Sequence, residues 1–325
     1  LSRIHQGLTA LAESCLEIAL ELAQEELAAR YGLSDIGRGF IPSRFAIIGL
    51  GKLGGGELGY GSDLDVVFVY EDEGSLPGGL SYREYFTKLA DRIIKILTVM
   101  TQEGSAYKVD PRLRPGGQKG ELAQPLRAYL THFASSADLW ERQAYLKARP
   151  VAGDPALGQG FVTLIHPLLF REEEPLAIKI DGMRRRMEEE RIKGKGVHVK
   201  LGSGGLVEVE FTVQFLQLKY GRGKPELWEP NTLLALEKLE QAGFLSKEDA
   251  ARLRESYLFL RRVEERLRIA AGLNVSALPE TKEKVRKLAK RLGYPGASPE
   301  EAFLADYAFH TKAVHGIYEK LVTGC

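Results

Sequence analysis

Cysteine, net charge and long apolar runs are all scarce in this sequence, and each scarcity excludes a class of protein. Cys15 and Cys325 are the only cysteines, so disulfide bonds do not hold the fold and a reducing, cytoplasmic location is expected. The formal net charge is +1, whereas proteins that bind nucleic acid usually show a basic footprint. No apolar run approaches the roughly 20 residues that span a bilayer, and residues 1–20 do not have the pattern of a signal peptide. We therefore expect neither a membrane nor a nucleic-acid partner.

Two regions of different character follow one another along the chain. Strands are predicted for the apolar runs at residues 45–51, 64–70 and 106–113. Helices are predicted at residues 8–31, 82–103, 126–133, 139–148, 158–169, 178–192, 207–220, 232–242, 247–271, 280–292 and 299–321. No strand is expected after about Leu122. The pattern predicts an α+β fold, in which a small mixed β-sheet core with helices (residues 1–122) precedes an all-helical bundle domain (residues 123–325).

A pair of carboxylates opens the second expected strand. Asp63 and Asp65 are two residues apart, so on a strand they point to the same face. Like charges this close repel, and a hard divalent cation with oxygen ligands is expected between them. Gly61 and Ser62, just before the pair, offer backbone N–H groups and a hydroxyl to a phosphate. Asp110, in the third expected strand, is a third candidate, and three converging carboxylates can hold Mg²⁺ ions for phosphoryl or nucleotidyl transfer.

Basic side chains near these carboxylates are candidates for phosphate contacts. Arg112 and Arg114 alternate with Asp110, and at strand spacing they would share its face and clamp phosphate oxygens. Lys52, inside the glycine-rich segment, fits a phosphate contact and a surface lysine equally well. A solvated strand end is the alternative explanation of any Asp-x-Asp pair, but the Gly-Ser before it and the apolar strand after it favour a site.

The segment Gly49–Gly54 also matches the G-x-G-x-x-G fingerprint of a dinucleotide-binding fold, with Glu71 or Asp72 about 20 residues further on. A βαβ unit, however, needs a crossover of a dozen or more residues between its strands. Only the glycine-rich segment 51–61 separates the two apolar runs, and it would make a poor crossover helix. We therefore disfavour this interpretation.

Sequence blocks at Gly49–Asp65, Val109–Leu122, Trp140–Asp154 and Lys200–Gly221 are specific enough to carry a resemblance. In this order, they resemble the glutamine synthetase adenylyltransferases (glutamate–ammonia-ligase adenylyltransferases), which belong to the DNA-polymerase-beta-like nucleotidyltransferase superfamily. The resemblance covers nearly the whole chain. It implies a small sheet followed by a helical domain.

The resemblance also implies one catalytic half of a longer enzyme, in agreement with the lack of an initiator Met. In this family the C-terminal half transfers AMP from ATP to a tyrosine of glutamine synthetase and so regulates nitrogen assimilation. The N-terminal half removes AMP by phosphorolysis, which gives ADP. The blocks look more like the adenylylating half, and the deadenylylating half is the alternative. A nucleotidyltransferase acting on nucleic acid or a small molecule is a third, less favoured possibility, and the near-neutral charge disfavours the nucleic-acid version.

Particular residues match the superfamily's motif. Gly61 and Ser62 match the pair that holds the triphosphate, Asp63 and Asp65 match the metal-binding pair, and Asp110 matches the third carboxylate, which would orient or deprotonate the tyrosine hydroxyl. The resemblance implies Mg²⁺ as cofactor, ATP as substrate and glutamine synthetase as partner, with a regulatory PII-type signalling protein as a further candidate.

Two of the other blocks contain residues whose role the sequence indicates less specifically. Glu208 and Glu210 lie where a helix is expected to begin, a place that favours acidic side chains, and a contact with the active site or a partner protein is the alternative. Trp140 is expected to be buried. A cleft is expected to be lined by Arg142, Lys147 and Arg149.

Overall fold

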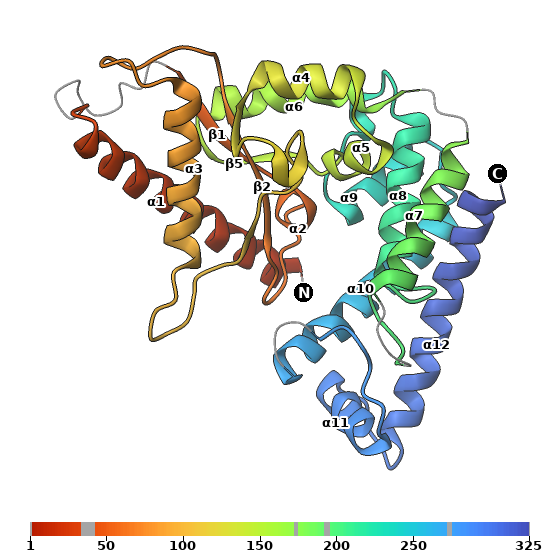
Figure 1. Cartoon of the computed structure of the whole chain (residues 1–325). Helices are drawn as coiled ribbons and strands as arrows, with labels where there is room; N and C mark the ends of the chain where they lie inside the picture. The colour runs from red at the N-terminus through yellow and green to blue at the C-terminus, as the bar shows by residue number, and fades with distance from the viewer. Residues whose placement is uncertain (1, 34–42, 172–174, 192–195, 272–274, 325) are drawn as a thin grey trace. The chain divides into compact units, whose positions relative to one another are not determined.

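The computed structural model describes residues 2–33, 43–171, 175–191, 196–271 and 275–324. The chain divides into two compact units, one of which is Ser2–Phe170 while the other includes Arg171–Cys325. The first unit contains the sheet and the second is helical (Figure 1). The functional domains expected at residues 1–122 and 123–325 stay a prediction.

A five-stranded mixed sheet forms the centre of the first unit. Its strands are β1 (Phe45–Gly49), β2 (Leu64–Tyr70), β3 (Val109–Asp110), β4 (Ala123–Pro125) and β5 (Arg149–Gly153). β1 pairs antiparallel with β2 on one side and with β5 on the other, while β3 and β4 both pair parallel with β2. Since the strands of a βαβ unit are parallel, the antiparallel pairing of β1 with β2 confirms that the glycine-rich segment is not a dinucleotide-binding crossover.

Two strand predictions were wrong. The strand expected over residues 106–113 is reduced to the two residues of β3, and the expectation of no strand after Leu122 missed β4 and β5. The helix expected at residues 139–148 ends at Tyr145, and the chain then turns into β5. β5 contains Pro150 and partly exposed residues, so it lacks the apolar run of β1 and β2; a strand at the end of the sheet order tolerates such a sequence.

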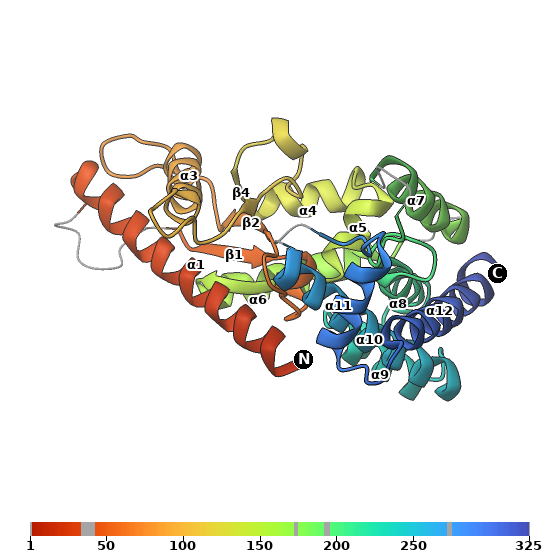
Figure 2. The same cartoon turned by 90° about the horizontal axis from the view of Figure 1, so that it is seen from below.

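Helices cover both faces of this sheet. On one face, α1 (Ser2–Arg30) and α3 (Tyr82–Thr98) pack against each other and enclose the apolar core. On the other face lie α4 (Leu126–Ser135) and α6 (Pro155–Leu169) (Figures 1 and 2). Two short helices, α2 (Gly51–Gly54) and α5 (Leu139–Tyr145), flank the sheet. A sheet covered in this way buries all five residues of β1.

The second unit is built from α7 (Leu176–Arg191), α8 (Leu206–Tyr220), α9 (Thr232–Gln241), α10 (Lys247–Ala271), α11 (Lys282–Leu292) and α12 (Pro299–Tyr318). The helix α8 is buried on nearly every side, as expected of a helix at the centre of a bundle. The predicted α+β class and the helical second part are therefore confirmed.

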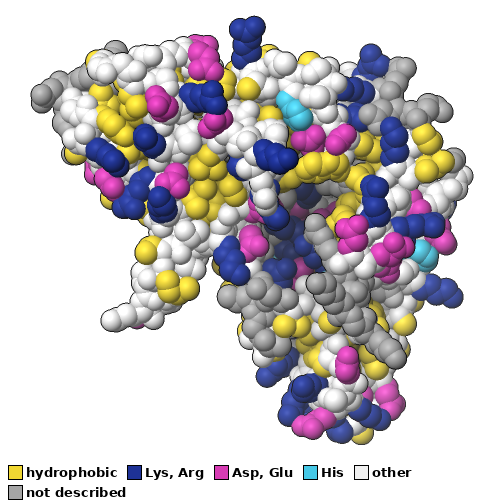
Figure 3. All heavy atoms as spheres, viewed as in Figure 1, with side chains coloured by type: hydrophobic (Ala, Val, Ile, Leu, Met, Phe, Trp, Pro, Cys, Tyr) yellow, Lys and Arg dark blue, Asp and Glu magenta, His cyan; other side chains and the backbone are white. Residues whose placement is uncertain are grey.

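Charged side chains of both signs lie on the surface of the protein. On the face drawn in Figure 3, basic and acidic side chains are interspersed, which agrees with the net charge of +1. Among the described helices, none has the length and apolar character needed to cross a membrane.

Candidate active site

Strand alternation places two of the candidate carboxylates on one face of the sheet, and the third directly precedes it. In β2, Leu64 belongs to the apolar core under α1 and α3, so Asp65 points to the opposite face. Asp63 is the residue before β2. In β3, Val109 packs against the same core, and Asp110 therefore faces the same way as Asp65. The parallel register pairs Asp65 directly with Asp110. Residues that are 45 positions apart in sequence are thus neighbours across two strands.

A tight turn holds Gly61 and Ser62 immediately before the carboxylates. Gly61 has φ +60°, a left-handed conformation that favours glycine. The backbone N–H of Ser62 donates to the carbonyl of Gly59 (3.2 Å), and the N–H of Gly59 donates to Ser62 Oγ (3.2 Å). These reciprocal hydrogen bonds fix the direction in which the chain enters β2.

The glycine-rich segment reaches the carboxylate of Asp65 at Gly51. Gly51 has φ +52°, and a Cβ placed on it would lie 2.4 Å from Asp65 Oδ2. Only a residue without a side chain leaves this carboxylate undisturbed. A glycine at position 51 is therefore needed to leave the Asp65 carboxylate in its place.

Arg112 holds the carboxylate of Asp110 in this structure. Its Nε lies 2.8 Å from Asp110 Oδ1 and 3.0 Å from Oδ2, its backbone N–H donates to Oδ1 (3.0 Å), and Nη2 makes a further contact with Oδ2. The hydrogen bond from Arg112 is the main cause that lowers the pKa of Asp110. Asp65 and Asp63 also raise the pKa of Arg112, after the larger effect of Asp110. The guanidinium therefore lies in the field of all three carboxylates.

Among the described residues, no group of three metal-ligating side chains is assembled. The donor set nevertheless consists of carboxylate oxygens, which Mg²⁺ prefers. The Arg112 side chain is 64% exposed, so it is free to rotate away from Asp110 without leaving a packed position. The chemistry of these three carboxylates therefore suits Mg²⁺.

Arg114 and Lys52 have different surroundings. Arg114 is buried, and its guanidinium donates to the carbonyls of Pro111 (2.7 Å) and Gly120 (3.0 Å). Burial lowers its pKa. These contacts hold the loop that carries Arg112. Lys52 lies half-buried on α2, beside the close approach of Gly51 to Asp65.

A buried ion pair that the sequence analysis missed anchors the glycine-rich segment. Lys147 Nζ lies 2.8 Å from Glu57 Oε2, and the two side chains are 8% and 5% exposed. Arg149 Nε donates to the carbonyl of Gly54 (2.9 Å), and a Cβ on Gly54 would lie 1.9 Å from the carbonyl oxygen of Lys147. The predicted cleft lined by these basic residues was wrong, because Lys147 and Arg142 are buried. Trp140, predicted to be buried, is 46% exposed.

Comparison with known proteins identifies the family. A family model described as glutamate-ammonia ligase adenylyltransferase matches residues 1–163. A bifunctional glutamine synthetase adenylyltransferase/adenylyl-removing enzyme of Stenotrophomonas maltophilia (strain K279a) is 39% identical over 313 residues, which cover 92% of this chain and 33% of that protein. The chain belongs to the glutamate–ammonia ligase adenylyltransferase family. The resemblance read from the sequence blocks is thereby confirmed.

Other relatives in the adenylyltransferase family agree. Proteins with the same printed name from Streptomyces coelicolor and Methylococcus capsulatus are 37% and 34% identical, over 97% and 96% of this chain. The chain spans about a third of the length of these relatives (32% and 33%). A second family model, described as GlnD PII-uridylyltransferase, matches residues 177–322.

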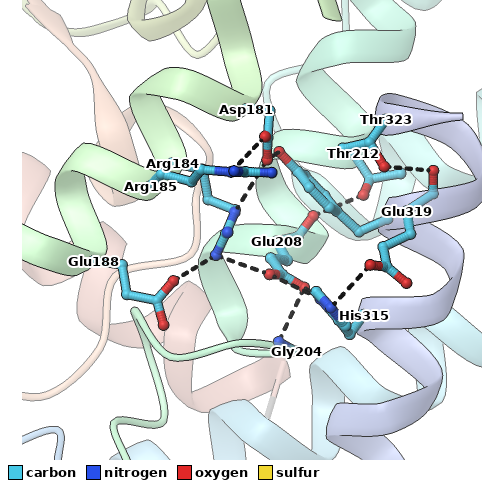
Figure 4. Close-up of polar contacts among 11 residues, drawn as sticks. Asp181, Arg184, Arg185, Glu188, Gly204, Glu208, Thr212, His315, Glu319 and Thr323 are labelled. Atoms are coloured by element: carbon cyan, nitrogen blue, oxygen red, sulfur yellow. Dashed lines mark hydrogen bonds and ion pairs between the residues drawn. The ribbon is translucent and has the colours of Figure 1, made fainter. Parts of the chain in front are cut away.

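The region of this second match contains a buried polar network around Glu208 (Figure 4). Glu208 lies in the first turn of α8, as predicted, and its side chain is 1% exposed. It accepts a hydrogen bond from the N–H of Gly204 (2.9 Å) and lies 3.1 Å from both Arg184 Nη1 and His315 Nδ1. Burial raises the pKa of Glu208, while His315, Gly204 and Arg184 act in the opposite direction. The network joins α7, α8 and α12, which explains why this sequence block carries an acidic residue beside glycines.

Proposed function

We propose that this chain transfers AMP from ATP to a tyrosine hydroxyl of glutamine synthetase. The observation that carries the proposal is the alignment of Asp65 opposite Asp110, with Asp63 directly before the same strand. The glycine-serine turn directly before Asp63 and the membership in the adenylyltransferase family support it. The printed names of the relatives include glutamine synthetase as the protein acted on.

Each residue of the carboxylate face has a proposed part. Asp63, Asp65 and Asp110 would hold Mg²⁺, which supplies charge neutralisation at the phosphates and lowers the pKa of the attacking hydroxyl. The Gly61-Ser62 turn would donate backbone N–H groups to the triphosphate. Asp110, ionised at neutral pH like an ordinary aspartate, would orient the tyrosine hydroxyl and accept its proton as the new bond forms.

The bond changes in this transfer are simple. The tyrosine oxygen attacks the α-phosphorus in line, the bond from the α-phosphorus to the bridging oxygen of the β-phosphate breaks, and pyrophosphate leaves. Arg112 would turn from Asp110 to the phosphate oxygens, because a guanidinium binds phosphate and carboxylate with the same fork of donors. We propose Lys52 as a further phosphate contact. Arg114 would act by holding the loop of Arg112.

Removal of AMP is the second candidate, because the relatives are named as adenylyl-removing enzymes as well. In that reaction phosphate attacks the phosphorus of the AMP–tyrosine linkage, the tyrosine oxygen leaves, and the product is ADP. A carboxylate face of this kind would serve either reaction.

One assay separates the two directions. The protein is incubated with Mg²⁺, ATP labelled on the α-phosphate and unmodified glutamine synthetase, and separately with phosphate and the modified form. Label on glutamine synthetase supports adenylylation, and ADP release supports the reverse reaction. Asp63→Asn combined with Asp65→Asn is expected to abolish either activity, while Asp72→Asn, beyond the opposite end of β2, serves as a matched control. Full activity of the double variant would refute the assignment of the site.

We also propose a cytoplasmic location, which the two-cysteine composition supports, and a PII-type signalling protein as a regulatory partner. The second proposal is supported by the match of residues 177–322 to a PII-uridylyltransferase model. A pull-down with purified PII-type protein tests it, and no retention by the chain at micromolar concentration would contradict it.

A further inference from the structure

The chain between α3 and β3 forms a hairpin that turns at residues 102–103, and the arm leading from α3 into this turn presents two adjacent apolar side chains to solvent. Val99 is 56% exposed and Met100 is 75% exposed. Met100 has the largest exposed fraction among the large hydrophobic side chains in the described part of the chain. Single exposed apolar residues are common on protein surfaces, but an adjacent pair on one arm of a projecting hairpin is a more specific feature.

The hairpin is held in shape by its own hydrogen bonds. The backbone N–H of Thr101 donates to the carbonyl of Gly104 (3.0 Å), and the N–H of Gly104 donates back to Thr101 (3.1 Å). Thr101 Oγ1 donates to the same carbonyl of Gly104 (2.7 Å), and Gly104 has φ +99°. At the base, the N–H of Tyr107 donates to the carbonyl of Leu97 (3.0 Å). Val99 and Met100 therefore lie between two fixed points, the Leu97–Tyr107 hydrogen bond and the Thr101–Gly104 turn.

Topology places this hairpin at the edge of the sheet that carries the carboxylates. β3 runs parallel to β2, so the chain enters β3 from the side on which β2 begins, the side of Gly61 and Asp63. The N–H of Leu64 donates to the carbonyl of Lys108 (2.8 Å) at this point. From Gly104 to Asp110 the chain can extend at most about 20 Å. Figure 1 shows the hairpin after α3 projecting from the first unit.

We propose that this hairpin docks the protein acceptor, with Val99 and Met100 packing against an apolar surface beside the tyrosine that receives AMP. The inference rests on the proposed function, which gives the site a folded protein as substrate. A small-molecule acceptor would need no apolar contact outside the site. A methionine suits such a contact because its flexible thioether adapts to irregular surfaces. Glu103 is the only charged side chain between Val99 and Tyr107, so the surface it meets is expected to be mainly apolar.

The test replaces both side chains with serine, Val99→Ser together with Met100→Ser. Direct binding to unmodified glutamine synthetase is expected to weaken by about tenfold or more, given the apolar area removed, and the KM for glutamine synthetase is expected to rise by a similar factor. The Kd for ATP is expected to stay unchanged. Leu11→Ser on α1 is the matched control, because Leu11 has the same exposed fraction, 56%.

Each result of this test either supports or overturns the docking proposal. Unchanged binding of glutamine synthetase by the double variant overturns the proposal, as does failure of the unsubstituted chain to bind glutamine synthetase. If the unsubstituted chain is a dimer by light scattering and the double variant is a monomer, the hairpin contacts a second copy and the proposal is also overturned. Hairpin-dependent binding without AMP transfer or removal would support the docking site and refute the proposed function instead.

Discussion

Replacing Gly51 by alanine should displace the Asp65 carboxylate and lower activity strongly, while it lowers the stability of the fold only slightly. Two effects combine at this position. The left-handed backbone, φ +52°, costs an alanine roughly 1–2 kcal/mol. The new Cβ would lie 2.4 Å from Asp65 Oδ2, about 1 Å closer than an ordinary contact. Because Oδ2 is the end of a side chain, we expect the carboxylate to rotate away, so that the clash displaces Asp65 without unfolding the loop.

Gly56→Ala is the matched control for this substitution. Gly56 lies in the same segment with φ +66° and has no atom within 4 Å of a built Cβ. Both variants are expected to lose a similar free energy of unfolding, roughly 1–2 kcal/mol, measured by urea titration. Only Gly51→Ala is expected to lose activity, on the order of 100-fold, since a displacement of about 1 Å at a reacting centre has that effect. The reasoning is refuted if AMP transfer or removal falls equally in both variants, or if Gly51→Ala retains it.

Three further predictions concern buried polar groups of the first unit. Lys147→Met leaves the carboxylate of Glu57 buried without its cation and is expected to cost about 3–5 kcal/mol in urea unfolding; a change under about 1 kcal/mol would contradict the ion-pair role. Burial lowers the pKa of His166 from 6.5 to about 4, so the stability from its neutral form is present above pH 6.5 and is lost as pH falls toward 4. In the His166→Gln variant, the loss of unfolding free energy between pH 6.5 and pH 4 should therefore be smaller by roughly 3 kcal/mol. An unaltered pH profile of stability would contradict this role of His166. The hydroxyl of Tyr85 is buried without a partner in the described structure, whereas that of Tyr145 donates a hydrogen bond at 2.9 Å. Tyr85→Phe should therefore stabilise the fold and Tyr145→Phe should destabilise it, each by about 1 kcal/mol. Equal effects of the two substitutions in thermal unfolding would be inconsistent with this contrast.

Most of the local structure could be predicted from periodicity. β2 begins and ends at the predicted residues 64 and 70, and the helices of the second unit follow the predicted ranges closely, because long amphipathic or wholly apolar patterns leave few alternatives. β5 was missed because its residues are only half-buried and follow directly on a helix. Its strand character comes from pairing with β1, which lies about 100 residues earlier in the sequence and leaves no local signal.

Part of the candidate site could likewise be predicted from local sequence and part could not. The closeness of Asp63 and Asp65 could be predicted because their spacing of two residues is a local property. The position of Asp110 opposite Asp65 depends on the pairing of β3 with β2. The anchoring of the glycine-rich segment by Lys147 could not be predicted, since an ion pair between residues 90 positions apart depends on the packing of the whole unit. The i, i+2 spacing of Lys147 and Arg149, which resembles the alternation of a strand, was the one available hint.

The late position of β5 in the chain has a consequence for how the protein is made. β1 is hydrogen-bonded along both sides, to β2 and to β5, and all five of its residues are buried. A ribosome must therefore synthesise the chain as far as Gly153 before this central strand can be enclosed. Until then the nascent chain exposes an open apolar edge, which favours association with other chains or capture by a chaperone. A polypeptide that stops at residue 122 would retain all three candidate aspartates and still be expected to aggregate.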